Sequence, residues 1–80
     1  MLFIGGNKSV SSCDLICILN YDEMDNEANR SIYKDFSGKN KVLDITQGSR
    51  PKSIIITENM LYLSAISSVT LQKRADILMN

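Results

Sequence analysis

Two apolar runs without polar alternation are the clearest feature of the hydrophobic pattern along the chain. Leu15–Leu19 reads Leu-Ile-Cys-Ile-Leu, and three isoleucines form the middle of Ser53–Thr57. A strand with one face in water alternates apolar and polar residues, whereas a strand covered on both faces is apolar throughout. Both segments are therefore predicted to be strands that are buried on both faces.

Shorter patterns predict the remaining strands and the turns between them. Gly5-Gly6-Asn7 is a turn signal after a first short apolar segment. Glu58-Asn59 separates two apolar segments by two residues, which predicts a hairpin in which Asn59 takes a left-handed conformation. Besides Leu15–Leu19, the predicted extended segments are Leu2–Gly5, a stretch at Val10, Lys41–Thr46, Ser53–Thr57 and Met60–Ser64.

Two segments change to the helical period. Between Asp22 and Gly38, apolar residues fall four apart, with Asp25 as the predicted N-cap and Gly38 as the stop. A final helix is predicted from a cap at Ser67 or Ser68 to about Leu78. The apolar stripes are Met24, Ala28, Ile32 and Phe36 in the first helix, and Leu71, Ala75 and Leu78 in the second.

These elements predict an α+β fold in a single domain spanning residues 1–80. We expect a small, mostly antiparallel sheet of about five strands with two short helices. Two short helices cover one face of such a sheet, and the central strands are apolar on both faces. The spare apolar face is therefore predicted to meet another subunit, so the chain is expected to form a homo-oligomer.

Composition and charge sharpen this picture. The chain has 80 residues, 44% of them hydrophobic and 22% charged, which is typical of a globular protein of marginal size. Its net charge is zero, which by itself argues against nucleic-acid binding. The charges are segregated, however: residues 21–38 carry five acids and two bases, and residues 39–52 carry four bases and one acid. One surface is therefore expected to be locally basic.

Catalysis is not expected. The chain has no histidine, which removes the usual general base near neutral pH. No Gly-rich phosphate loop is present, so we expect neither an enzyme nor a cofactor. Cys13 and Cys17 are four apart and are predicted to lie on one face of a strand as buried, reduced thiols, the alternative being a zinc site shared between subunits. We expect no bound metal.

No membrane segment is predicted. The apolar run Leu2-Phe3-Ile4 is too short for a signal peptide. No stretch approaches the roughly 18 apolar residues of a membrane span. A cytoplasmic protein without membrane contact is therefore expected.

The turn before Ser53 is the main candidate for a binding site. It holds Arg50 and Lys52 around Pro51, the only proline of the chain, and Ser49 and Ser53 add hydroxyl donors. Proline restricts the backbone, and arginine offers a planar fork suited to phosphate. The alternative interpretation is a solvated turn with no ligand, since exposed cations in turns are common.

The same residues carry a resemblance to a known family. The segment from Gly48 to Thr57, followed by Leu61–Ser64 and Ser67–Ala75, resembles the extracellular matrix regulatory proteins RemA and RemB, and is closer to RemB. The resemblance spans nearly the whole chain. It implies a bacterial cytoplasmic protein of Gram-positive type that assembles into rings and activates biofilm-matrix genes by binding DNA. In RemA the DNA-contacting loop is an arginine-rich segment at the position of residues 49–52.

Residue by residue, Arg50 and Lys52 match the basic positions of that loop. Ser49 stands where RemA has arginine, and Asp14 stands where RemA carries another basic residue. The leading hypothesis is a non-enzymatic, ring-forming transcriptional regulator that binds the phosphates of duplex DNA, with Arg50 as the main anchor, Lys52 as the second, and Ser49 and Lys41 as supports. The alternative is a self-assembling protein-interaction module with little DNA affinity, followed by a small enzyme or anion-sensing domain.

Overall fold

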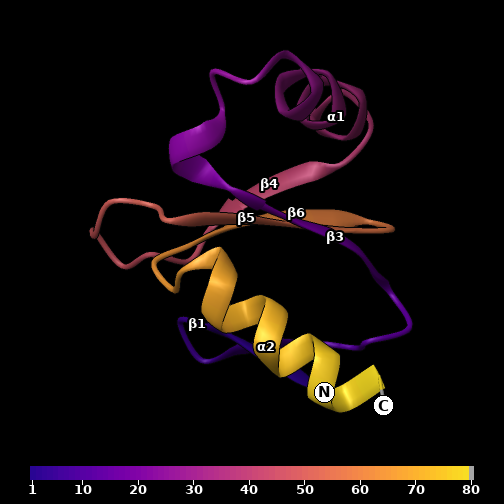
Figure 1. Ribbon diagram of the computed structural model, residues 1–80, viewed down its shortest axis with the longest axis vertical. Helices are drawn as coiled ribbons and strands as arrows, with labels where there is room; N and C mark the ends of the chain where they lie inside the picture. The colour runs from indigo at the N-terminus through magenta and orange to yellow at the C-terminus, as the bar shows by residue number, and fades with distance from the viewer. Residues whose placement is uncertain (80) are drawn as a thin grey trace.

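The computed structural model describes residues 1–79 and has an α+β fold. Figure 1 shows a central sheet with α1 on one side, and α2 together with the strand β1 on the other. The elements are β1 (Leu2–Gly5), β2 (Lys8–Val10), β3 (Leu15–Asn20), a short 3-10 helix η1 (Tyr21–Glu23), α1 (Glu27–Ser37), β4 (Lys41–Asp44), β5 (Ser53–Thr57), β6 (Met60–Ser64) and α2 (Ser68–Met79).

The strands form two sheets rather than the one sheet of about five strands that the sequence predicts. β1 and β2 make an antiparallel ribbon, and the other four strands lie in the order β3-β5-β6-β4. β5 is antiparallel to both of its neighbours, whereas β4 is parallel to β6. The α+β class and the mostly antiparallel pairing are thus confirmed, and the count and the grouping of the strands are corrected.

β5 is covered on both faces within the single chain. All five of its residues are buried. Ile55 belongs to a core with β1, β2 and α2, while Ile54 and Ile56 belong to a second core on the opposite face, under α1 and η1. The prediction that the helices would leave one face bare is wrong, because the β1–β2 ribbon joins α2 in covering the second face.

Two cores therefore flank the sheet. The first contains Leu2, Ile4, Val10, Ile55, Tyr62, Leu71 and Ala75. The second contains Leu19, Ile54, Ile56 and Leu61, with Tyr21, Met24, Ile32, Tyr33 and Phe36 packed against them. Burial of this apolar surface is the main stabilising term of so small a chain.

The edges of the four-stranded sheet are less covered than its faces. β3 lies at one edge, and its Ile16 side chain is 45% exposed. The prediction that Leu15–Leu19 is buried on both faces is therefore wrong for Ile16. β4 forms the other edge, where Val42 and Leu43 are exposed.

The cap of α1 lies one residue after the predicted position, and the cap of α2 is one of the two predicted serines. The N-cap of α1 is Asn26, not Asp25: its side-chain oxygen accepts from the backbone N–H of Ala28 at 2.9 Å. Gly38 ends α1 as predicted. The predicted apolar stripe is wrong at Ala28, whose side chain is exposed. In α2 the hydroxyl of Ser67 accepts from Thr70 N–H, which satisfies a free donor of the first turn.

The C-terminal stripe is confirmed as far as the structure describes it. Leu71 and Ala75 are buried against the first core. The predicted contribution of Leu78 lies outside the residues whose side chains are described.

The β1–β2 turn contains residues with positive φ, whereas Asn59 in the β5–β6 turn is not among them. The predicted turn at Gly5-Gly6-Asn7 is confirmed, and all three residues have positive φ. Asn59 is not among the positive-φ residues, so its predicted conformation is wrong. The hairpin between β5 and β6 is closed instead by the hydroxyl of Thr57, which accepts from Met60 N–H at 3.1 Å.

Candidate nucleic-acid interface

Residues 45–52, here called the basic loop, connect β4 to β5 around the carboxyl end of β6. The loop is hydrogen-bonded to β6 at both ends: Ile45 N–H donates to Leu63 O at 3.0 Å, and Lys52 N–H donates to Ser64 O at 2.8 Å. The carbonyl of Lys52 also accepts from Tyr21 N–H at 3.0 Å. The backbone on either side of the candidate residues is thereby fixed to the sheet.

The start of the basic loop is held by the last residue of β4, Asp44. Asp44 accepts from both the hydroxyl of Thr46, at 2.6 Å, and its backbone N–H, at 2.9 Å. These two hydrogen bonds lower the pKa of the Asp44 carboxyl, and the bond from the Thr46 hydroxyl has the larger effect. The chain then reverses at Gln47 and Gly48, both of which have positive φ. Ser49, Arg50 and Lys52 thus follow a turn of defined backbone conformation.

The β1–β2 turn supports the start of the basic loop. A Cβ atom added at Gly6 would lie 2.6 Å from the carbonyl oxygen of Ile45, a contact that real Cβ atoms do not make. The absence of a side chain at Gly6 therefore allows the two backbones to pack together.

Arg50 is exposed and forms an ion pair that the sequence analysis missed. Its Nη2 atom donates to Oδ1 of Asp22 at 2.9 Å, with the two side chains 77% and 63% exposed. No other ion pair occurs between side chains of the part of the chain that the structure describes. The pair joins the acidic segment 21–38 to the basic segment 39–52, so the local positive charge is smaller than the segregation along the sequence indicates.

Strand pairing explains why these two residues meet. Asn20 at the end of β3 lies opposite Ser53 at the start of β5. Asp22 follows Asn20 by two residues, and Arg50 precedes Ser53 by three, so both leave the sheet at the same end. The opposite charges were visible in the sequence, but the register that brings them together was not.

Three of the predicted binding residues lie together. Ser49, Arg50 and Lys52 are all exposed in the basic loop. Ser53, which was expected to offer a hydroxyl, is fully buried and donates to Ile66 O at 2.7 Å, so that expectation is wrong. Its buried position follows from its place in the central strand β5.

Lys41 lies at the other end of the sheet. It is paired with Met60 at the start of β6, whereas the basic loop begins and ends at Leu63 and Ser64. Four residue steps of β-strand separate these ends, roughly 13 Å. Within one chain, Lys41 is therefore not brought together with Arg50 and Lys52.

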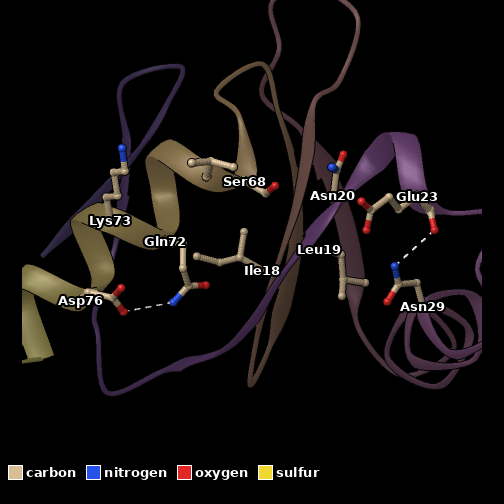
Figure 2. A pocket seen from close by; sticks show the side chains of 10 residues that line it. Ile18, Leu19, Asn20, Glu23, Asn29, Ser68, Gln72, Lys73 and Asp76 are labelled. Atoms are coloured by element: carbon tan, nitrogen blue, oxygen red, sulfur yellow. Dashed lines mark hydrogen bonds between the residues drawn. The ribbon is translucent and has the colours of Figure 1, made fainter.

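An open groove of about 490 Å³ lies between α2 on one side and β3, η1 and α1 on the other (Figure 2). Ile18 and Leu19 line it together with polar side chains. Among the residues that line it, Lys73 is the single cation, while Glu23 and Asp76 contribute two carboxylates. The balance of charge is negative, so this groove does not suit a polyanion.

The other cation of α2 has a structural contact. The guanidinium of Arg74 donates to Phe3 O at 3.1 Å and lies 5.9 Å from the centre of the Phe3 ring. It thereby fastens α2 to β1. The basic loop remains the best candidate for contact with an anion.

The two cysteines differ in their exposure. Cys13 lies in a turn before β3 and is exposed, which corrects the prediction that both thiols are buried on one strand. Cys17 is half-buried in β3, and this burial raises the pKa of its thiol. Among residues 1–79 no cluster of three or more histidine, cysteine, aspartate or glutamate side chains is arranged to hold a metal ion.

These observations define a small α+β protein with an exposed cationic loop anchored at one end of its sheet. A family model described as RemA-like, "Extracellular matrix regulatory protein A-like", matches residues 1–75. The chain belongs to this family of extracellular matrix regulatory proteins, and the match does not distinguish RemB from RemA. A comparison with individually curated proteins gave no match. Within the described residues, no helix has the length and apolar character needed to cross a membrane.

Proposed function

We propose that this chain is a non-enzymatic, ring-forming, cytoplasmic regulator that activates extracellular matrix genes by binding duplex DNA. The DNA is held by phosphate contacts from the basic loop rather than by readout of base edges. The observation that carries the proposal is the presentation of exposed Arg50 and Lys52 from a loop whose backbone is hydrogen-bonded to β6 at both ends. Membership of the extracellular matrix regulatory family supports it.

The chemistry of the basic loop fits a phosphate ligand. Arginine presents five N–H donors in a planar fork, and lysine adds a compact charge. The contact with Asp22 is made through one nitrogen of Arg50, which leaves further donors for a phosphate oxygen. Because the loop is anchored, little conformational entropy is lost when an anion binds.

One basic loop makes one or two phosphate contacts, so useful affinity requires several copies. Linked sites raise affinity through effective concentration, and each neutralised phosphate adds about −0.9 to the salt slope. We expect many loops of one assembly to act on the same duplex. Specificity then comes from DNA shape and bending.

Because both faces of the sheet are covered within the chain, the proposed self-association takes place at the edges of the sheet. β3 and β4 are the two edge strands, and Ile16, Val42 and Leu43 are exposed along them. Through the pairings with β5 and β6, these two edges run in the same direction. Pairing of β4 in one copy with β3 in the next is a head-to-tail contact, the type of contact that closes rings.

Duplex binding across a salt series tests the DNA contact. We expect the native chain to bind with a steep salt dependence and Arg50→Ala to lose most of that affinity. Arg30→Ala, which removes an exposed arginine from α1, is the matched control and should bind as the native chain does. Equal effects of the two substitutions would overturn the role of the basic loop.

The mass of the assembly in solution tests the edge contact separately. Val42→Lys places a charge on the edge strand β4 and is expected to reduce the mass. Val69→Lys changes an exposed valine on α2 in the same way and should leave the mass unchanged. A native chain that is monomeric at micromolar concentration would rule out the ring.

A second candidate function is a self-assembling protein-interaction module with little DNA affinity. The Arg50–Asp22 ion pair favours it, because it neutralises the main anchor within the chain. The zero net charge points the same way. An assembly of high mass that fails to bind duplex DNA at low salt would select this alternative.

A further inference from the structure

We infer that Asp22 is a built-in competitor of the DNA phosphate: its carboxylate occupies the anion position on Arg50 and thereby sets the affinity of each basic loop. The inference rests on the proposed function, since it concerns the same loop. Asp22 lies 28 positions before Arg50 in the sequence, and no feature of the basic loop itself indicates this contact.

The backbone places Asp22 beside the loop. Asn20 caps the 3-10 helix η1, and its side-chain oxygen accepts from Asp22 N–H at 3.0 Å. The next residue, Tyr21, donates its N–H to Lys52 O. Asp22 is thus fixed from both the strand β3 and the basic loop, and its contact with Arg50 follows from that arrangement.

A carboxylate and a phosphate make the same kind of contact with a guanidinium. Both accept charge-assisted hydrogen bonds from its N–H donors. The distance of 2.9 Å between Nη2 of Arg50 and Oδ1 of Asp22 is that of such a bond. A phosphate oxygen that approaches the same nitrogen must displace the carboxylate or bind beside it.

The exposure of the pair makes displacement feasible. Arg50 and Asp22 are both largely in contact with water, where an ion pair contributes little. A phosphate on duplex DNA brings the additional gain of counterion release, which an internal carboxylate does not. Asp22 therefore weakens the binding of DNA without abolishing it.

Glu23 provides a matched comparison. It is adjacent to Asp22, exposed and of the same charge, but its side chain lies at the groove of Figure 2 and has no hydrogen bond to the basic loop within the described residues. Asp22→Asn and Glu23→Gln change the net charge equally. Only the first removes the charged partner of Arg50.

The test measures the affinity of the full chain for a duplex at fixed ionic strength. Asp22→Asn is expected to tighten binding by about two- to fivefold for each engaged loop, and by more where several loops hold one duplex. Glu23→Gln should change affinity by much less. In an Arg50→Ala background, the effect of Asp22→Asn should disappear. Equal effects of both substitutions, weaker binding by Asp22→Asn, or an effect that survives in Arg50→Ala would overturn the inference.

A second titration separates this inference from the proposed function. Tripolyphosphate serves as the probe, and the NMR signal of the Arg50 Nε–H group reports its binding. Asp22→Asn should tighten this binding by the same two- to fivefold, and an unchanged affinity would overturn the competition. If no variant binds duplex DNA while tripolyphosphate responds as expected, DNA binding is wrong as the function, and the competition of Asp22 with a phosphate for Arg50 stands.

Discussion

The hydroxyl of Ser64 donates a hydrogen bond to the carbonyl oxygen of Ile4 at 2.6 Å, joining residues 60 positions apart. Both residues are fully buried. The same hydroxyl accepts from Ile66 N–H at 3.0 Å, and the backbone oxygen of Ser64 accepts from Lys52 N–H. Ser64 at the end of β6 therefore connects the β1–β2 ribbon and the basic loop through its hydrogen bonds.

Replacement of Ser64 by alanine is predicted to destabilise the fold by about 2–4 kcal/mol, because a buried carbonyl and a partly buried N–H lose their partner. The free energy of unfolding from denaturant titration measures this. Ser9→Ala, at an exposed position of β2, is the control and should change stability by less than about 0.5 kcal/mol. Similar losses in the two variants would show that the ribbon is not fastened through Ser64.

Elements with strong local signals could be predicted from the sequence. The β5–β6 hairpin, the packing of Ile32 and Phe36 of α1 against the sheet and the Ser67 cap of α2 depend on residues close together in the chain. The position of the β1–β2 ribbon could not be predicted in this way. It lies on a face of the sheet through contacts such as Ser64 to Ile4, which no local pattern indicates.

The candidate site was predictable to the same extent. Ser49, Arg50 and Lys52 could be grouped as a candidate site because they lie within four consecutive residues. The partner Asp22 depends on the register between β3 and β5, and the separation of Lys41 depends on the parallel pairing of β4 with β6. Both are long-range properties, and pairing register is set by the whole fold rather than by the segment.

Truncation of Ile56 to alanine is predicted to destabilise the fold much more than truncation of Ile77. Ile56 is fully buried in the core under α1, whereas Ile77 on α2 is 76% exposed. Ile56→Ala should cost about 2–5 kcal/mol, because it leaves a cavity in a packed core. Ile77→Ala should change the free energy of unfolding by less than about 0.5 kcal/mol.

Denaturant titration of the two variants decides the point. The comparison tests the finding that one chain covers both faces of β5. A small effect of Ile56→Ala on a monomeric form of the chain would mean that this face is open until another copy covers it.

The two thiols are predicted to differ in reactivity. Cys13 is exposed in a turn, while Cys17 is half-buried and burial raises its pKa. Since the thiolate is the reactive species, iodoacetamide at pH 8 should alkylate Cys13 faster, by about tenfold. Mass spectrometry of Cys13→Ser and Cys17→Ser gives the separate rates. In guanidinium chloride the rates should converge, and equal rates in the native chain would contradict the described position of Cys17.

The start of the basic loop carries a pH dependence through Asp44. Its carboxylate accepts two hydrogen bonds from Thr46, which lower its pKa in the folded chain. A folded pKa below the unfolded one means that the ionised carboxyl stabilises the fold. This stabilisation is fully present above the ordinary pKa of 3.8 and is lost as the pH falls through the lower folded value.

Thr46→Val removes the hydroxyl, the larger of the two causes, and keeps the shape of a buried side chain. The Asp44 pKa should therefore rise toward its ordinary value, and the loss of stability due to this group between pH 5 and pH 2 should become smaller. Carboxyl ¹³C NMR titration measures the pKa directly. Thr70→Val, at an exposed position of α2, is the control and should leave the Asp44 titration unchanged. An Asp44 pKa that is the same in the native chain and in Thr46→Val would show that the hydroxyl does not hold the carboxylate, and the basic loop would then lack this support at its first turn.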